Sequence, residues 1–526
     1  MRSPGRSTPH ALRVPSDKKV ARYRDATSRL DCPRTGNTDA RSPLEAILNR
    51  RGSKLYFVVA AVSTVLALLR YVVLARLLGP AELGIAATIV VIGTFFDQIA
   101  DVGTDRFIIQ DREGGDEIVQ GLVQTVTVGR GLVVACALLV SAIPLAIFFR
   151  TPALASGLAL LAVSPAISGF THLDSRRAQR AHDFRADALQ TIGGEVCGFI
   201  AMCLSAVLLQ DFRAVVVGII VRSLSSVVIT HILAQRPYRL SWSAAHWPRL
   251  ARFSIPLMAN GLMVFAASQS DRLIVSHELG PAALGFYSSV LLLIYYPAAL
   301  LTRFSFTLSM PLIANARLDP KAQRRAIDAL GGQILLLAVV MAAGFALVAP
   351  VMVPVLFGKR FQQPALMVGL VGCLQTVRFL MNGPTTIAMA TGRTIMVLVS
   401  NLGHVLAFVG ALIGVRLGHD LMSLMAGFII GEFLAVILSV TLVNRDTGQP
   451  VLHRLDRVAS FLAACLLITG ANLALSAGAA LPLAGLAVLA AALATWLAVS
   501  ETEVITQAHR MVLAALPRLS LHRQSR

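Results

Sequence analysis

The chain has 526 residues, of which 56% are hydrophobic and only 14% are charged, and its formal net charge at neutral pH is +19. A soluble globular protein carries about 25% charged residues, so this composition excludes that class. A basic excess is also typical of nucleic-acid binding, but in a membrane protein it marks the loops that face the cytoplasm, and we expect no nucleic-acid partner.

The first fifty residues are rich in Arg, Ser and Pro without hydrophobic periodicity, which predicts a disordered basic cytoplasmic tail at 1–50 and no signal peptide. Apolar stretches of about 20 residues then follow one another, the length that crosses about 30 Å of hydrocarbon as a helix. They predict an all-α polytopic membrane protein with fourteen transmembrane helices, at 55–77, 84–104, 121–149, 153–172, 188–209, 214–234, 253–277, 284–312, 329–356, 364–390, 395–417, 420–443, 457–477 and 481–500.

One turn motif occurs twice. The sequence Leu-Gly-Pro-Ala-x-Leu-Gly stands at 78–84 and again at 279–285, a shift of 279 − 78 = 201 residues, and each copy separates two apolar stretches. Gly tolerates left-handed angles at a helix end, and Pro is favoured in the first turn of the next helix. The repeat predicts two six-helix bundles at 51–240 and 241–445, then a terminal helix pair at 446–500 and a cytoplasmic tail at 501–526.

The positions of Lys and Arg predict the orientation. One side receives most of them, including the tail before the first span and the loops near 176–185, 236–252, 317–325 and 445–457. This asymmetry places both termini in the cytoplasm. The loop 105–120 is net acidic and departs from the trend. No loop between spans exceeds roughly twenty residues, too few for a soluble catalytic domain of about 50, so we expect no enzyme activity.

Ionisable residues inside the spans are the candidate functional residues, because each costs about 2.5–3.5 kcal/mol at a helix centre. Basic groups match or outnumber acidic ones, which favours a hydrated cationic cavity between the halves for a phosphate or other anionic group. The substrate-binding candidates are Arg70, Arg130, Arg272, Arg303 and Arg378, and the gating or ion-coupling candidates are Asp97, Asp101, Glu195, Asp271 and Glu432. No cysteine or histidine spacing typical of a metal site occurs, and we expect no metal or cofactor.

Several pairings stay open. Arg70 and Asp271 are equivalent in the repeat (271 − 70 = 201), so they either pair across the halves as a gate or have different partners. Arg272 adjoins Asp271, and the two either neutralise each other or contact substrate. Arg303 and Arg70 are the best cavity candidates. The other arginines have structural alternatives, since Asp101, Glu195 and Glu432 are available to pair with Arg130, Arg222 and Arg378.

Five sequence motifs occur in a fixed order and spacing: LARLLGPAELG at 74–84, FFDQIADVG at 95–103, DRLIVSHELGP at 271–281, FGKRF at 357–361 and ATGR at 390–393. Together they resemble the Wzx-type polysaccharide flippases of O-antigen and exopolysaccharide synthesis, a branch of the multidrug/oligosaccharidyl-lipid/polysaccharide (MOP) exporter superfamily. The resemblance covers roughly residues 50–445.

The resemblance implies two helix bundles facing a central cavity, in a multi-pass protein of the bacterial inner membrane. It implies that a polyprenyl-diphosphate-linked oligosaccharide is flipped to the outer leaflet by alternating access, for lipopolysaccharide or exopolysaccharide biosynthesis. Membrane lipids, a polysaccharide polymerase and chain-length proteins are the implied partners. Related peptidoglycan-precursor flippases use cavity arginines, which supports Arg70 and Arg303.

Two alternatives remain. An ion-coupled multidrug exporter of the same superfamily is favoured by a cavity with mainly acidic groups, and the surplus of arginines argues against it. A polysaccharide polymerase or ligase also has many spans but presents a large outer loop with polar residues, whereas every predicted outer loop here is short.

Overall fold

The computed structural model describes residues 51–180, 183–316, 319–362, 364–393, 396 and 403–447. Within these ranges the regular secondary structure is entirely helical, and eight helices are long and apolar enough to cross a membrane. This confirms the all-α, multi-span class. The expected spans at 457–477 and 481–500, the start of the span at 395–417, and both tails lie outside the described residues, so the count of fourteen stays a prediction.

The first half of the described chain follows the expected spans closely. Proline 80 starts α4 four residues earlier than expected, and the span expected at 153–172 is divided into two short helices at residue 162. The helices are α3 (Arg51–Leu78), α4 (Pro80–Ile99), α5 (Thr104–Gln110), α6 (Glu117–Phe148), α7 (Ala153–Leu161), α8 (Val163–Ser168), α9 (Asp174–Arg180), α10 (Arg185–Leu209) and α11 (Arg213–Leu233).

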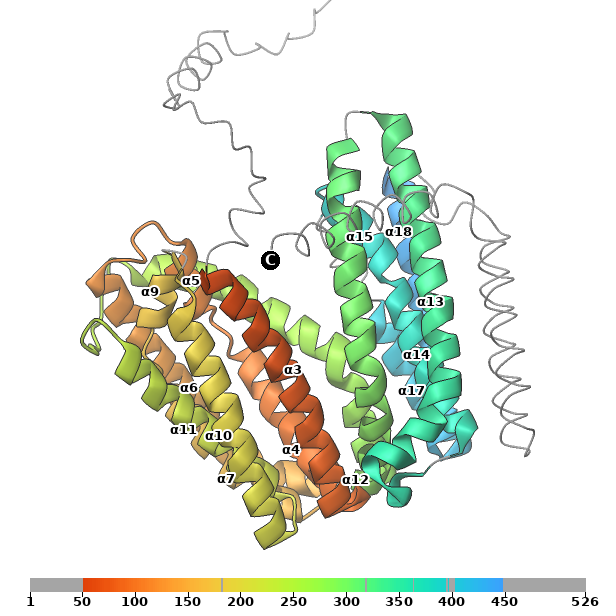
Figure 1. Ribbon diagram of the computed structural model, residues 1–526, viewed down its shortest axis with the longest axis horizontal. Coiled ribbons are helices and arrows are strands. Elements are labelled where there is room, and N and C mark those ends of the chain that lie inside the picture. Colours follow the sequence, from red (N-terminus) through yellow and green to blue (C-terminus); the bar gives the residue numbers. More distant parts are fainter. Residues whose placement is uncertain are drawn as a thin grey trace, which may run out of the picture. The chain divides into compact units, whose positions relative to one another are not determined.

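The second half begins with one long element, α12, in which two helices meet at Gly280. The packing is antiparallel between sequence neighbours: α10 lies along α11, and α17 along α18, while α12 lies along α4 of the first half (Figure 1). The elements are α12 (Trp247–Asn315), α13 (Pro320–Phe357), η2 (Lys359–Phe361), α14 (Ala365–Leu380), α15 (Asn382–Ala390), α17 (His404–Gly418) and α18 (Leu421–Thr447).

The repeated turn has the same backbone conformation in both copies. Gly79 has φ 79° and ψ 175°, and Gly280 has φ 81° and ψ 175°. Positive φ of this kind is open to glycine at no steric cost, which explains the residue at both positions. The repeat found in the sequence is therefore also a repeat of local structure.

The two turns also pack against each other reciprocally. A Cβ atom added at Gly84 would lie 1.6 Å from the carbonyl oxygen of Pro281, and one added at Gly285 would lie 2.0 Å from that of Pro80. Each copy thus places a glycine against the backbone of the other copy. The helices that follow the two turns are in direct backbone contact, with no room for a side chain between them.

This contact predicts a steep cost for a single methyl group. Gly84→Ala is expected to lower the free energy of unfolding by about 3 kcal/mol or more, because backbone on both sides must move. Gly129→Ala in α6 is the matched control, since nothing lies within 4 Å of its added Cβ. The control is expected to be neutral or stabilising by up to about 1 kcal/mol, from helix propensity. Thermal unfolding in detergent checks both, and equal melting temperatures would contradict the prediction.

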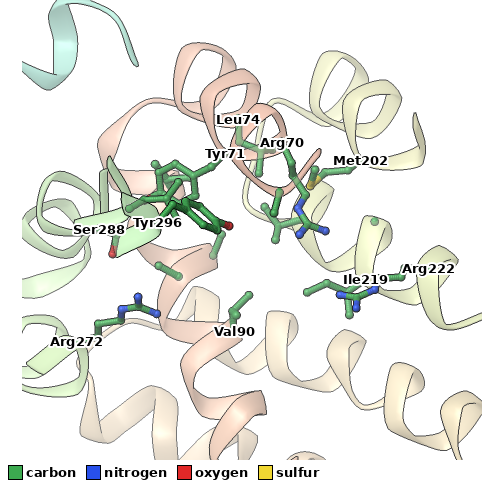
Figure 2. Close-up of a pocket in the computed structure, with 17 residues that line it drawn as sticks. Arg70, Tyr71, Leu74, Val90, Met202, Ile219, Arg222, Arg272, Ser288 and Tyr296 are labelled. Atoms are coloured by element: carbon green, nitrogen blue, oxygen red, sulfur yellow. The ribbon is translucent and has the colours of Figure 1, made fainter. Parts of the chain in front are cut away.

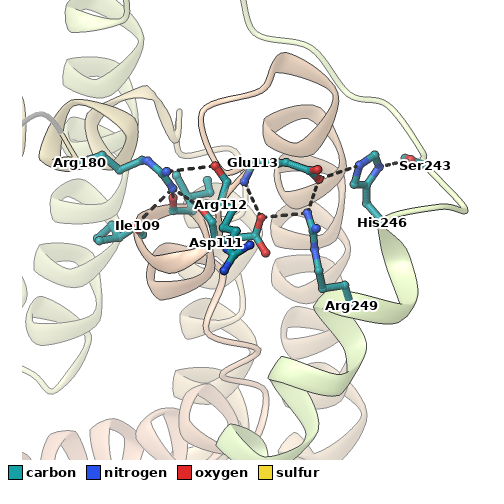
Figure 3. A network of polar contacts seen from close by, with 9 residues as sticks. Ile109, Asp111, Arg112, Glu113, Arg180, Ser243, His246 and Arg249 are labelled. Atoms are coloured by element: carbon teal, nitrogen blue, oxygen red, sulfur yellow. Dashed lines mark hydrogen bonds and ion pairs between the residues drawn. The ribbon is translucent and has the colours of Figure 1, made fainter. Parts of the chain in front are cut away.

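The acidic loop that departs from the charge trend is paired with basic residues of α9 and α12 (Figure 3). Arg249 donates to Asp111 Oδ1 at 2.9 Å and to Glu113 Oε2 at 2.7 Å, and His246 Nε2 lies 3.3 Å from the same Glu113 oxygen. Arg180 donates to the carbonyl of Ile108 at 2.8 Å. The acidic groups of this loop are therefore local counter-charges for the start of α12.

This network predicts a pH dependence. The hydrogen bond from Arg249 holds the pKa of the Glu113 carboxyl below its ordinary value of 4.5. A carboxyl group whose pKa is lowered in the folded protein stabilises the fold at pH values above its ordinary pKa. This contribution is lost as the pH falls through the lowered pKa. The difference in melting temperature between wild type and Glu113→Gln is expected to be larger at pH 6 than at pH 3. Glu117→Gln is the control, because its contact with Arg239 is 3.5 Å long and exposed. A constant difference would contradict the prediction.

Candidate functional site

A cavity of about 280 Å³ lies among α3, α4, α10, α11 and α12. Arginines from three helices line it: Arg70 of α3, Arg222 of α11 and Arg272 of α12. Figure 2 shows their guanidinium groups directed toward one space from different sides. The rest of the wall is mainly apolar, with Tyr71 and Tyr296 among the few polar residues. The arrangement concentrates positive charge against a mainly apolar wall.

One carboxylate holds two of these arginines. Glu195 of α10 is 3.4 Å from Arg70 Nη1 and 3.0 Å from Arg222 Nη2. The close approach of α10 and α11 makes this possible. Gly198 of α10 has no side chain, and a Cβ atom added there would lie only 2.7 Å from the Cβ atom of Arg222. Three guanidinium groups and one carboxylate leave this cluster with a net positive charge, because Glu195 pairs with Arg70 and Arg222 and not with Arg272.

Three buried polar atoms of the cavity lining lack a hydrogen bond. They are the Tyr71 hydroxyl, Arg272 Nε and the Ser288 hydroxyl. The Tyr71 and Ser288 hydroxyls interact with each other, in a contact looser than a regular hydrogen bond. Arg272 donates from Nη1 to Gln269 at 2.9 Å, which leaves Nε free. An unsatisfied buried polar group costs about 1–3 kcal/mol, so a ligand with acceptor oxygens would relieve a cost already present.

A second cluster of buried charges lies deeper in the second half. Arg378 donates from Nε to Glu432 at 2.8 Å and from Nη1 to Asp271 at 3.0 Å. Tyr287 donates to Asp271 at 2.6 Å. The side chains of Asp271 and Glu432 are 0% and 1% exposed. This cluster has its polar groups paired and is separate from the residues that line the cavity.

These contacts decide the pairings left open by the sequence. Asp271 pairs with Arg378 and not with Arg70, whose carboxylate partner is Glu195, so the cross-half pairing of Arg70 with Asp271 is absent. The neighbouring Arg272 makes its hydrogen bond to Asp271 through the backbone N–H, at 2.9 Å, and its side chain lines the cavity. Arg222 and Arg378 do pair with Glu195 and Glu432, two of the carboxylates expected.

The remaining candidates lie elsewhere. Arg130 donates to the carbonyl of Asp97 at 3.0 Å and is 3.6 Å from its carboxylate, rather than pairing with Asp101. Asp101 accepts from the N–H of Gly103 at 3.0 Å, in the turn between α4 and α5, and lies 3.5 Å from Arg106. Arg303 is exposed and is not among the residues that line this cavity.

The cavity also contains residues that the sequence did not single out. Tyr71 and Ser288 are ordinary polar residues of apolar spans, and only their missing hydrogen bonds distinguish them. No sequence signal marks such an absence. Among the described residues, no group of three or more His, Cys, Asp or Glu side chains is placed to hold a metal ion.

Comparisons with known proteins agree with this architecture. A family model described as polysaccharide biosynthesis protein matches residues 73–365. The succinoglycan biosynthesis transport protein ExoT of Rhizobium meliloti (strain 1021) is 25% identical over 292 residues, which cover 55% of this chain and 58% of that protein. The chain thus matches less than two thirds of this relative's length.

Two solved structures share the fold at low sequence identity. The lipid II flippase MurJ, in an inward closed conformation, aligns with a TM-score of 0.61 and 13% identity, over 88% of this chain and 100% of that one. A multidrug resistance MATE family transporter of the MOP superfamily, in an inward-facing conformation, aligns with a TM-score of 0.55 and 14% identity, over 73% and 94%. The resemblance carried by the sequence motifs is confirmed: the chain is a multi-pass membrane protein with the MOP-superfamily fold, and it belongs to the polysaccharide biosynthesis protein family.

Proposed function

We propose that this protein moves a polyprenyl-diphosphate-linked oligosaccharide across the bacterial inner membrane by alternating access, for surface or exopolysaccharide biosynthesis. The observation that carries the proposal is the cavity lined by Arg70, Arg222 and Arg272, the first two of which share a single carboxylate, that of Glu195. Family membership supports a role in polysaccharide biosynthesis. ExoT is named as a transport protein and MurJ as a flippase, and both names support transport as the activity.

The proposed binding step is an exchange of partners. A diphosphate offers oxygens that accept paired hydrogen bonds from guanidinium groups, which are about twice as strong as neutral ones. It would compete with Glu195 for Arg70 and Arg222, and it would use the free donors of Arg272, Tyr71 and Ser288 directly. The lipid chain stays in the bilayer, so the protein needs no pocket for it. The contacts with Glu195 hold Arg70 and Arg222 in place, which lowers the entropic cost of binding.

The proposal includes orientation and partners. The basic side of the chain, with both termini, faces the cytoplasm, where the lipid-linked sugar is loaded. Membrane lipids surround the spans, and a polymerase and chain-length proteins use the delivered product. Asp97, Asp101 and Glu432 keep their proposed place as gating or ion-coupling residues, and all three also have the structural contacts described above.

The alternative, an ion-coupled multidrug exporter, has one observation in its favour, which is the MATE-like fold. Its substrates are often cationic, and a hydrophobic cation in this cavity would meet three arginines in the lining. The like charges disfavour that occupant.

Thermal stabilisation of the purified protein tests the proposal. Undecaprenyl-diphosphate-linked sugar is expected to raise the melting temperature, and undecaprenyl monophosphate to raise it less, because it offers fewer acceptor oxygens. Tetraphenylphosphonium, a hydrophobic cation, is expected to have no effect. Stabilisation by the cation and not by the lipid would replace the flippase proposal with the exporter.

A further inference from the structure

The end of the molecule that contains the two Gly-Pro turns holds a second pair of equivalent contacts. Arg76, near the end of α3, donates from Nε to the carbonyl of Leu356 at 2.8 Å and from Nη2 to that of Val355 at 2.6 Å. Both carbonyls belong to the last turn of α13, where they have no partner inside the helix. A cation at a helix C-terminus also interacts favourably with the helix dipole. Arg76 therefore caps a helix of the opposite half of the chain.

The residue equivalent to Arg76 in the repeat is His277, since 277 − 76 = 201. Its Nδ1 lies 3.1 Å from the carbonyl of Phe148, the last residue of α6. Its ring stacks on the Phe148 ring, with centroids 4.2 Å apart and planes 12° apart. Because a carbonyl only accepts, Nδ1 must be the donor. His277, which belongs to the second half, therefore caps a helix of the first half.

The two capped helices are themselves equivalent. Phe149 follows the last residue of α6, and Phe357 is the last residue of α13. The sequence Pro-Ala-Leu follows both, beginning three residues after Phe149, at 152–154, and seven residues after Phe357, at 364–366. The contacts are thus reciprocal: the helix before each Gly-Pro turn reaches across to the end of the same helix in the other half. They flank the reciprocal packing of Gly84 and Gly285, which joins the same two turns.

We propose that this end is a gate, and that Arg76 and His277 are its two equivalent locks. The proposal rests on the alternating-access function, because only a transporter of that kind must separate the halves at one end. Backbone packing at Gly84 and Gly285 seals the end, and the two caps hold the seal. Opening requires the carbonyls of α6 and α13 to exchange these donors for water. Arg76 makes two hydrogen bonds and always carries a charge, while His277 makes one, so Arg76 is the stronger lock.

Cysteine labelling from one side of the membrane tests the gate. In a variant without the six natural cysteines, Ser288→Cys places a thiol in the cavity wall, where it replaces a hydroxyl of similar size. A membrane-impermeant maleimide is added to sealed vesicles of each orientation, so that it meets either the Gly-Pro end or the opposite end. Arg76→Ala is expected to raise the labelling rate from the Gly-Pro end roughly tenfold, the effect of losing hydrogen bonds from a charged group.

Further variants make the result specific. His277→Ala is expected to raise the rate less than Arg76→Ala, and the double variant more than either. His277→Arg copies the equivalent residue and is expected to label no faster than wild type. Arg213→Ala is the matched control, because this exposed arginine near the start of α11 pairs with Asp211 of its own half. If an alanine variant fails to fold, Arg76→Lys and His277→Gln replace it, with smaller increases expected.

Two outcomes would overturn the gate. One is a wild-type labelling rate in the double variant, and the other is an equal increase from both ends, which indicates general loosening. The assay contains no substrate, so its failure is distinguishable from failure of the proposed function. If the lipid stabilises the protein but the variants label at the wild-type rate, only the gate proposal is wrong. If the variants label faster but the lipid does not stabilise the protein, only the proposed substrate is wrong.

Discussion

Replacing Arg272 by glutamine is expected to reduce transport of polyprenyl-diphosphate-linked sugar at least tenfold while the protein stays folded. Arg272 has a free buried donor in the cavity, and Glu195 pairs with the other two arginines, so the charge of Arg272 is available to the ligand. Loss of a hydrogen bond from a charged group costs about 1.5–3 kcal/mol, and 1.4 kcal/mol is a tenfold change. Flipping of a fluorescent substrate analogue in proteoliposomes measures the effect.

Arg303→Gln is the matched control for this prediction. It removes the same charge from the same element, α12, at an exposed position outside the cavity lining. Transport by this variant is expected to stay within about twofold of wild type. If Arg303→Gln abolishes transport and Arg272→Gln does not, the cavity described here is not where the substrate binds, and Arg303 regains the role that the sequence suggested.

Glu195→Gln distinguishes two roles of this carboxylate. If Glu195 competes with the diphosphate, the substitution frees Arg70 and Arg222, and binding of the lipid is expected to tighten. If Glu195 is an ion-coupling group, the substitution is expected to leave the affinity unchanged and stop transport. Titration of the lipid against the melting temperature measures the affinity and distinguishes the two roles.

Arg378→Gln is expected to lower the stability of the protein by about 3–5 kcal/mol, the cost of removing one partner from a buried ion pair. The substitution leaves Asp271 and Glu432, both almost fully buried, without their shared cation. Arg222→Gln is the control, because Arg222 is 48% exposed and its loss leaves Arg70 beside Glu195. Thermal unfolding in detergent is expected to show a much larger decrease for Arg378→Gln.

The neutral triple variant Asp271→Asn, Arg378→Gln, Glu432→Gln tests the cause of this loss. If uncompensated buried charge is responsible, the triple variant is expected to recover a large part of the stability lost in Arg378→Gln, because no charge then stays buried. Equal stability of the triple variant and Arg378→Gln would show that the side-chain packing of Arg378, and not its charge, is what the cluster requires.

The sequence by itself determined the membrane class, the position of most helices and the repeated turn. These features depend on local chemistry: the thickness of the hydrocarbon sets the length of an apolar stretch, and a backbone with positive φ selects glycine at 79 and 280. The flippase motifs likewise depend on residue order along the chain, and they predicted the family that residues 73–365 match. Nothing in these inferences requires knowing which helices touch.

The tertiary structure alone decided the partners of the intramembrane charges. Arg70 and Asp271 are equivalent in the repeat, but equivalent positions in two packed halves are adjacent only near the axis that relates them, and these two residues bind Glu195 and Arg378 instead. The same relation explains the reciprocal contacts of Gly84 and Gly285. The depth of Arg303 in a predicted span made it a candidate for the cavity, but it lies on an exposed side of its helix. The free donors of Tyr71, Arg272 and Ser288 exist only in relation to neighbours distant in sequence, because a side chain lacks a hydrogen bond only once its surroundings are fixed.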